Sequence, residues 1–402
     1  MKTFKRIIVS LLSLFAGLFV VLLGIFIVAI VSNINVIDEN IKFQEEHLEY
    51  LEKEYYKNYT QKNEADLADF DLEKAIEDGV KLNEIAILGT HNSYQRLATA
   101  ETRFAMNIID TITFKKAGLN TFDFEMDTLT EQLEMGVRNV EIDIETLDKD
   151  DKIEFKVTHN SIVDNASSAY DFTKALQEIK MWSDNNPRHI PVIVIVEPKS
   201  FVIEINGMKK FSLGYAKELD KIIENTLGDS LLTPKDVLRN YASFKEMREN
   251  DDWISLKEAQ GKILVLLHDC DVTESYIALD ESIKTQKMFP MLRYDDRNES
   301  YTSFILENDP WNADSRKAET IDECNLIVRT RADKYPDFSD ERYEITENCG
   351  SQIITTDFPE KVNGNESHSY SFDGKKIKRI KSWELRIKNF GSPADLIIIN
   401  YQ

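Results

Sequence analysis

Two histidines, one asparagine and three carboxylates lie in or directly after four successive short runs of β-branched residues. In chain order they are His91, Asn92, Glu141, Asp143, His159 and Glu197. The carboxylates and the amide offer only oxygen ligands, which suit a hard divalent cation better than they suit zinc or copper. An imidazole titrates near neutral pH and can therefore act as a general acid or base. A cation beside an acid–base pair suits displacement at a phosphodiester, where the metal binds a phosphoryl oxygen and the attacking hydroxyl.

The oxygen ligands predict Ca²⁺, with Mg²⁺ as the alternative. Glu141 and Asp143 are two residues apart, so they point to the same face of a strand. On an inner strand of a barrel that face is the interior, where an unpaired carboxylate is costly and a bound cation removes the cost. The predicted metal ligands are Asn92, Glu141, Asp143 and Glu197. The predicted acid–base pair is His91 and His159, and His268, which ends a later strand, is the rival histidine.

From residue 80 onward, short β-branched runs alternate with amphipathic segments typical of helices, such as 171–185 and 213–227. Strands that alternate with helices predict parallel βα units. Eight candidate strands in about 280 residues fit a (β/α)8 TIM-type barrel, whose catalytic groups lie at the C-terminal ends of the strands. The candidate strands are 85–89, 139–145, 154–158, 192–197, 262–268, 289–292, 326–330 and 352–356.

Residues 7–31 form an apolar run of 25 residues that is interrupted only by two serines and two glycines. About 20 apolar residues are enough to cross a bilayer as a helix. Lys2, Lys5 and Arg6 precede the run, so the positive-inside rule puts the N-terminus in the cytoplasm and the rest of the chain outside. The run ends in a poor cleavage site, which favours an uncleaved single-pass anchor in the cell membrane over a cleaved and secreted protein.

The sequence therefore divides into an anchor (1–37), a charged stalk (38–80), the barrel (81–360) and a C-terminal tail (361–402). Apolar residues recur at roughly helical spacing in the stalk, which predicts a charged helix. A short coiled coil that joins two copies of the chain into a homodimer is the alternative for this segment. The tail is rich in lysine and then β-like over 395–401.

The net charge of −22 excludes some partners. It repels phosphate backbones, so we expect no nucleic-acid partner. It also repels anionic lipid headgroups, so contact with a membrane requires a hydrophobic device such as the apolar run.

Several segments resemble the calcium-dependent phosphatidylinositol-specific phospholipase C family. Residues 89–94 (GTHNSY) resemble its first motif, and 129–133 (LTEQL) with 136–143 (GVRNVEID) resemble its second. Residues 182–191 resemble the approach to the fourth strand. Weaker markers are 308–310, 331–333 and 355–359.

The resemblance implies a barrel, a calcium ion and attack by the inositol 2-hydroxyl on phosphorus. Diacylglycerol then leaves and a cyclic inositol phosphate forms. His91 and His159 match the two catalytic histidines of the family, and Asn92, Glu141, Asp143 and Glu197 match its calcium ligands. Metal-independent relatives have an Asp-x-Arg pattern on the second strand, whereas this chain has Glu-Ile-Asp.

Other roles stay open at this point. His159 is our choice for protonating the departing glycerol oxygen, whereas the base is His91, Glu141 or Glu197. Lys199, Arg331 and Asp357 are expected either to bind substrate or to form internal ion pairs. Alternative functions are a glycerophosphodiester or sphingolipid phosphodiesterase on the same barrel and a non-catalytic surface binding protein.

Overall fold

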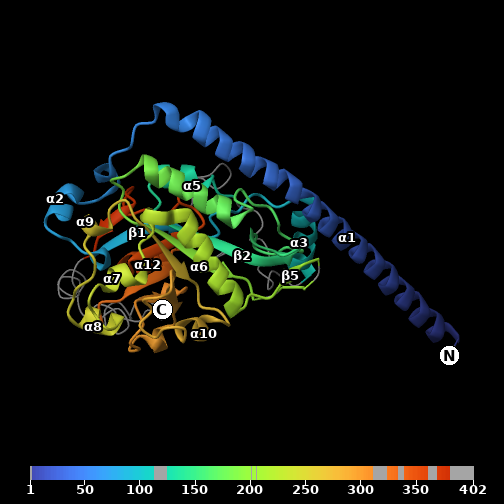
Figure 1. The fold of residues 1–402 in the computed structure, drawn as a ribbon. Helices are drawn as coiled ribbons and strands as arrows, with labels where there is room; N and C mark the ends of the chain where they lie inside the picture. Colours follow the sequence, from blue (N-terminus) through green and yellow to red (C-terminus); the bar gives the residue numbers. More distant parts are fainter. Residues whose placement is uncertain are drawn as a thin grey trace.

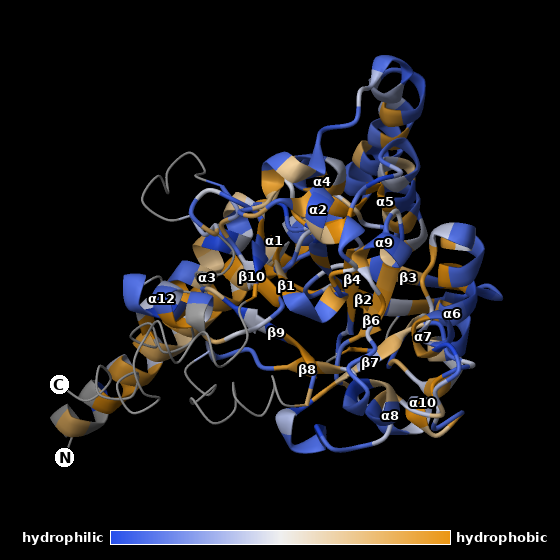
Figure 2. Cartoon of the chain, turned by 90° about the vertical axis from the view of Figure 1, so that its left-hand side faces the viewer, coloured by the Kyte–Doolittle hydropathy of each residue, from blue (hydrophilic) through white to orange (hydrophobic). Residues whose placement is uncertain are grey.

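The computed structural model describes residues 2–112, 125–200, 202–204, 206–310, 324–333, 339–360 and 369–380. Eight parallel strands form a ring with helices outside it (Figures 1 and 2). They are β1 (Ile85–Thr90), β2 (Asn139–Lys149), β4 (Val192–Pro198), β6 (Ile263–Leu267), β7 (Phe289–Leu292), β8 (Phe304–Leu306), β9 (Ile327–Arg331) and β10 (Ile353–Thr356). A pairing between β1 and β2 closes the ring. The predicted TIM-type barrel is confirmed.

One predicted strand lies outside the barrel, and one barrel strand was not predicted. The expected barrel strand over 154–158 is instead β3 (Lys152–Val157), which pairs antiparallel with β2. Strand β2 extends beyond the barrel and turns back through Asp150 and Asp151, both of which have positive φ angles. The eighth barrel strand is β8, whose three residues are too few for the alternating pattern that identifies a strand.

The helices surround the barrel. They are α2 (Leu72–Glu77), α3 (Ala100–Ile112), α4 (Leu129–Met135), α5 (Phe172–Asn185), α6 (Leu213–Leu227), α7 (Pro234–Leu238), α8 (Phe244–Glu249), α9 (Leu256–Ala259), α10 (Thr273–Ile277) and α12 (Asp340–Asn348). Two short strands lie outside the ring. They are β5 (Met208–Lys209), which pairs with β2, and β11 (Ile377–Arg379), which pairs with β1.

Alternation along the strands decides which side chains enter the barrel. On β4, Val192, Val194 and Val196 pack in one apolar cluster with residues of α5 and α6. Ile193 and Ile195 pack in a second cluster with residues of β6, β7 and β8. Because successive side chains of a strand point to opposite faces, Glu197 continues the inner row of Ile193 and Ile195.

Helix α1 (Lys2–Lys53) is a single element of 52 residues that combines the apolar run with the first part of the expected stalk. Its apolar part is long and hydrophobic enough to cross a membrane. Figure 1 shows the helix running along one side of the barrel and projecting past it to the N-terminus.

The segment that we expected to form a charged stalk, 38–80, lies against the barrel. The Asn40 amide donates to the backbone oxygen of Asn165 at 2.6 Å. The Gln44 side chain exchanges two hydrogen bonds with the backbone of Asp171, at 3.1 and 2.9 Å. Leu51 is buried as well. One face of this part of α1 thus contacts the chain's own barrel, which leaves less of the helix for the coiled coil considered above.

The C-terminal tail contributes β11, which pairs with the first half of β1 on the edge that β2 leaves free. The segment 395–401, expected to be β-like, lies outside the described residues.

Candidate active site

The loop after β1 is fixed by hydrogen bonds to α4. The Thr90 hydroxyl donates to Gln132 Oε1 at 2.6 Å, and Gln132 Nε2 donates to the backbone oxygen of Ser93 at 2.6 Å. The Ser93 hydroxyl accepts from the backbone N–H of Glu141 at 2.8 Å. A Cβ at Gly89 would lie 2.4 Å from Asn139 Oδ1, so a glycine is needed where β1 meets β2. The loop that carries His91 and Asn92 is therefore held at a defined height at the C-terminal end of the barrel, here called the mouth.

Asn92 has a positive φ of 48°, a conformation in which asparagine is one of the favoured residues. Its side chain is buried, and its Oδ1 has no hydrogen-bond partner within the described part of the chain. A buried carbonyl oxygen without a partner is unfavourable unless a ligand completes it.

Glu141 and Asp143 point into the barrel from β2, as predicted. Glu141 pairs with the buried guanidinium of Arg329, which lowers the pKa of the carboxyl against the rise caused by burial. Asp143 Oδ2 accepts from the Tyr94 hydroxyl at 2.8 Å and lies 2.5 Å from Lys199 Nζ. Burial raises the pKa of Asp143 well above its usual range, so its ionised form depends on nearby positive charge.

Glu197 lies on the neighbouring strand in register with Asp143. Burial raises its pKa, but Lys199, 3.3 Å away, and His268 outweigh burial and lower the pKa to about 2. One ligand atom from each of Glu141, Glu197 and His268 lies within 4.8 Å of the others. The structure thus brings a carboxylate pair from two strands to one point and adds His268.

These residues fit a calcium ion on the chemistry of their donors. Asp143 Oδ1, like Asn92 Oδ1, is buried and lacks a hydrogen-bond partner among the residues that the structure describes. An ion held by two such oxygens and by the carboxylates of Glu141 and Glu197 would satisfy all of them. Oxygen-only ligand sets of this kind suit Ca²⁺.

His91 is held at the mouth by a carboxylate. Its Nδ1 lies 2.8 Å from Asp357 Oδ1, and its Nε2 lies 3.9 Å from Glu141 Oε1. A carboxylate accepts a hydrogen bond, so the pair with Asp357 favours the tautomer with hydrogen on Nδ1 and leaves Nε2 facing the site. Burial, and then the charge of Arg331, hold the pKa of His91 well below its usual value.

His159 reaches the mouth by a route that differs from the expected one. It follows β3, which returns antiparallel from the far end of β2, so that Val157 pairs with Ile144. Its loop is fixed by Glu145 Oε1, which accepts from the backbone N–H of Ser161 at 3.1 Å. Burial, and then the charge of Lys199, lower the pKa of His159 to about 4.

The three residues expected either to bind substrate or to form internal ion pairs all lie at the mouth, and in this structure they form ion pairs. Lys199 contacts Asp143 and Glu197, and Arg331 pairs with Asp357 at 3.2 Å. The Asp357 backbone N–H is held in turn by Asp333 Oδ1 at 2.9 Å. The structure thus brings all nine predicted residues to one end of the barrel, and Asp357 lies behind His91.

Two contributors were missed by sequence reasoning. Arg329 stands two residues before Arg331 on β9, and this alternation was a signal that both enter the barrel. Glu145 continues the row of Glu141 and Asp143, but its contact with the loop of His159 depends on the β2–β3 turn.

Comparison with known proteins gives a family for the chain. The sequence matches the family "Phosphoinositide phospholipase C, Ca2+-dependent" over residues 80–151 and 145–381. A search of curated proteins found no significant match.

Two solved structures are similar to this chain. The first is a calcium-dependent phosphoinositol-specific phospholipase C from a Gram-negative bacterium, Pseudomonas sp. It shares 17% identity over 79% of this chain and 100% of its own, with a TM-score of 0.51. The second, from Streptomyces antibioticus, is a Ca²⁺-dependent phosphatidylinositol-specific phospholipase C and also shares 17% identity. It covers 69% of this chain and 94% of its own, with a TM-score of 0.48. The first of these likenesses supports the barrel fold.

The family match covers most of the chain, including β1, β2 and every predicted site residue. The resemblance seen in the sequence motifs is thereby confirmed, and so is the calcium that the family uses. The chain belongs to the family of calcium-dependent phosphoinositide phospholipases C.

Proposed function

We propose that this protein is a membrane-anchored, exported, calcium-dependent phosphodiesterase that cleaves phosphatidylinositol-type lipids to diacylglycerol and a cyclic inositol phosphate. The observation that carries the proposal is the pair of buried, unpartnered oxygens, Asn92 Oδ1 and Asp143 Oδ1, beside Glu141 and Glu197. His91, at 3.9 Å from Glu141, puts an imidazole next to this oxygen cluster.

The charges at the mouth support an anionic phosphodiester as the substrate. Four carboxylates (Glu141, Asp143, Glu197 and Asp357) face three cationic side chains (Lys199, Arg329 and Arg331). Among these ion-paired groups alone, four negative and three positive charges leave one negative charge, which a divalent cation changes to one positive charge. A phosphodiester monoanion then neutralises the site. The attraction between opposite charges is stronger in such a buried site than in water.

When bound, calcium would polarise a phosphoryl oxygen and make the attacking hydroxyl more acidic. Asn92, Glu141, Asp143 and Glu197 would hold the ion. Lys199, which already lies against two of these ligands, would contact the phosphate when its carboxylate partners turn to the ion.

The proton transfers fall to the histidines and carboxylates. The inositol 2-hydroxyl forms the new P–O bond and gives its proton to His91 or to one of the carboxylates Glu141 and Glu197. The bond from phosphorus to the glycerol oxygen breaks, and His159 supplies the proton that this oxygen takes. His159 is protonated for this step when the anionic phosphodiester beside it offsets the burial that lowers its pKa to about 4. Asp357 keeps His91 oriented, with Nε2 toward the reacting atoms.

Helix α1 supports the proposed anchor. Its apolar part is exposed in the isolated chain, and three basic residues precede it. A helix with this composition and flank spans a membrane with its basic end in the cytoplasm. The full-length protein should stay with the membrane fraction after an alkaline carbonate wash. Its recovery in the supernatant with a new N-terminus near residue 33 would point to cleavage instead.

The test of the reaction is product analysis. Full-length protein in detergent micelles with phosphatidylinositol should release diacylglycerol and a cyclic inositol phosphate in Ca²⁺, and neither product in a chelator. In calorimetry one calcium site should be present in the wild type and lost in Asp143→Asn. Release of glycerol phosphate or phosphocholine from other lipids would favour the related phosphodiesterases, and no turnover of any phosphodiester would favour a binding protein.

A further inference from the structure

Helix α3, which follows β1 at the mouth, is apolar on two sides. Its inner side carries the buried Ala105 and Met106. Its outer side carries Phe104, Ile108 and Ile112, which recur every four residues and so form one stripe along the helix. Phe104 and Ile112 are each 58% exposed. A soluble helix normally turns a polar face to water, so this outer stripe requires an explanation.

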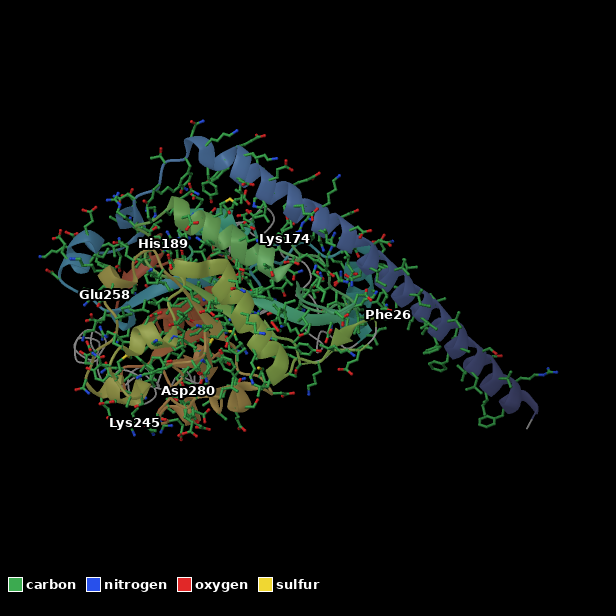
Figure 3. All side chains as sticks on the ribbon, viewed as in Figure 1. Phe26, Lys174, His189, Lys245, Glu258 and Asp280 are labelled. Carbon is green, nitrogen blue, oxygen red and sulfur yellow. The ribbon has the colours of Figure 1, made fainter. Side chains whose placement is uncertain are left out.

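The inner side of α3 packs against α1. Phe26 of α1 joins a small apolar cluster with Met106 and Ile109. The Ser32 hydroxyl donates to Glu101 Oε2 at 2.9 Å. Ser32 contacts Glu101, whereas the earlier residue Phe26 contacts residues later in α3. The two helices therefore run antiparallel. Figures 1 and 3 show α3 beside α1, near the labelled Phe26, where the long helix leaves the barrel.

The lengths put this contact at the edge of a bilayer. A hydrocarbon core of about 30 Å takes about 20 helical residues at about 1.5 Å each. A span that begins at Ile7 therefore ends near Phe26, the residue that packs on α3. Since α3 runs antiparallel to α1, from Glu101 toward the membrane, Ile112 lies about 9 Å deeper than Met106 at about 1.5 Å per residue, and the last turns of α3 enter the hydrocarbon. This depth matches the about 5–10 Å to which the apolar groups of membrane-surface segments are buried.

We infer that α3 has an interfacial role: it dips end-on into the membrane, and its stripe of Phe104, Ile108 and Ile112 inserts into the leaflet in which the C-terminal end of the α1 span lies. This rests on the anchoring role proposed above for α1. The barrel mouth would then face the membrane surface directly, and the enzyme would take lipid from the membrane that holds it.

The polar contacts of α1 support a fixed orientation of the mouth. Asn33 Oδ1 accepts from the backbone N–H of Asn165 at 2.6 Å. Asn165 belongs to the loop that follows His159, and the backbone of Ala166 in that loop accepts from Arg96 in the loop before α3. The α1 helix is thereby tied to both mouth loops that carry the catalytic histidines. The mouth cannot turn away from the membrane without breaking these contacts.

The test measures depth in the membrane without requiring turnover. Full-length F104W and I112W variants are reconstituted into phosphatidylcholine vesicles with bromine or a spin label on the acyl chains. The matched control is Y50W, because Tyr50 is 48% exposed and lies on α1 about 36 Å farther from the membrane than Phe26. Relative to the wild type, both α3 variants should gain fluorescence that the labelled lipids quench, and Y50W should not.

The outcomes separate this inference from the proposed function. Quenching of F104W and I112W no greater than that of Y50W overturns the interfacial role, even if the enzyme cleaves phosphatidylinositol. Selective quenching in a protein with no phosphodiesterase activity supports the interfacial role and defeats only the proposed reaction. As a second arm, the F104S/I112S variant should lose most of its rate on phosphatidylinositol in its own vesicle, whereas its calcium binding should match the wild type. An unchanged rate in that variant also overturns the inference.

Discussion

The hydrogen-bond partners of buried polar groups differ between the two ends of the barrel. At the end away from the mouth, the Arg138 guanidinium pairs with both oxygens of Glu64, donates to the backbone and stacks on Trp182 at 4.7 Å. His189, labelled in Figure 3, bonds Ser183 through one ring nitrogen and a backbone oxygen through the other. At the mouth, Asn92 Oδ1 and Asp143 Oδ1 are equally buried and have no partner in the described chain.

This difference distinguishes buried polar groups that stabilise the fold from those that bind a ligand. A buried polar group whose partners are all supplied by the chain fixes one packing arrangement and needs nothing else. A buried oxygen without a partner costs free energy that a ligand recovers on binding. Arg138 and Arg329 are both almost fully buried arginines with a glutamate partner, and the glutamate of Arg329 lies on the same strand as Asp143, whose Oδ1 lacks a partner among the described residues.

The largest effect is expected for the histidines of the mouth. His91→Ala and His159→Ala should each reduce turnover of phosphatidylinositol by about 10²–10⁴-fold, the usual worth of a general acid or base. The double variant should be little slower than either single variant, because the residues act as a unit. Kinetics on all three, with His47→Ala as the control, would measure this.

The roles of the two histidines can be separated with a good leaving group. A nitrophenyl phosphodiester of inositol needs little protonation of the departing oxygen, so it should rescue His159→Ala and leave His91→Ala slow. The reverse pattern would exchange their roles, and near-normal activity of both variants on phosphatidylinositol would refute the mechanism.

At the opposite end of the barrel, the same kind of truncation should affect stability and leave the chemistry intact. Arg138→Met leaves the buried Glu64 without its ion-pair partner and should lower the free energy of unfolding by about 3–5 kcal/mol. The control is Arg239→Met, whose ion pair with Asp252 is partly exposed and worth about 0–1 kcal/mol. Denaturant unfolding measures both, and kcat of the folded fraction should stay unchanged. A loss of calcium binding in Arg138→Met would contradict the division between the two ends.

Arg329→Met makes the matched change at the mouth, and there calcium should matter. Without calcium the variant should be destabilised like Arg138→Met, since Glu141 loses its partner. With calcium in excess, the loss of unfolding free energy relative to the wild type should shrink by roughly 1–2 kcal/mol. The ion stabilises the folded state because it binds only that state, and it replaces the lost positive charge. Thermal unfolding of both variants with calcium and with chelator gives the comparison. Equal deficits in the two conditions would mean that calcium does not replace the charge of Arg329 beside Glu141.

An effect of similar size to that of calcium on Arg329→Met is a pH dependence of stability from the end opposite the mouth. Burial lowers the pKa of His189 to about 4, so below pH 6.5 the unfolded chain binds a proton that the folded chain does not. His189 therefore favours folding fully above pH 6.5, and that contribution is lost as the pH falls from 6.5 toward 4. Between pH 7 and pH 5 the loss should be about 2 kcal/mol, from about 1.4 kcal/mol for each pH unit below 6.5.

His47 provides the control for that prediction, because its shift has the opposite sign. Although burial lowers it, the pair with Glu178 raises the pKa of His47 above 6.5, so its contribution is present at low pH and is lost as the pH rises. His189→Gln should flatten the decline in unfolding free energy between pH 7 and pH 5, whereas His47→Gln should steepen it. Identical pH slopes in both variants would argue against a buried neutral His189.

The sequence by itself determined the local features. Glu141 and Asp143 share a face because the side-chain period of a strand is two, and no tertiary information is needed for this. The β-branched runs alternating with amphipathic segments predicted the barrel, and the apolar run predicted a helix that can span a membrane. The motif around His91 predicted the family because its residue types and spacing are specific.

Tertiary structure decided everything that depends on which distant segments meet. Arg329 reaches Glu141 across 188 positions, and Asp357 reaches His91 across 266. Only the closure of the barrel brings β10 and β2 to either side of β1. The antiparallel return of β3 and the contact of α1 with the mouth loops are of the same kind, since both depend on hydrogen bonds between segments whose own residues favour no particular partner. Local periodicity orients a side chain, whereas the partner that it meets is set by packing free energy summed over the whole chain.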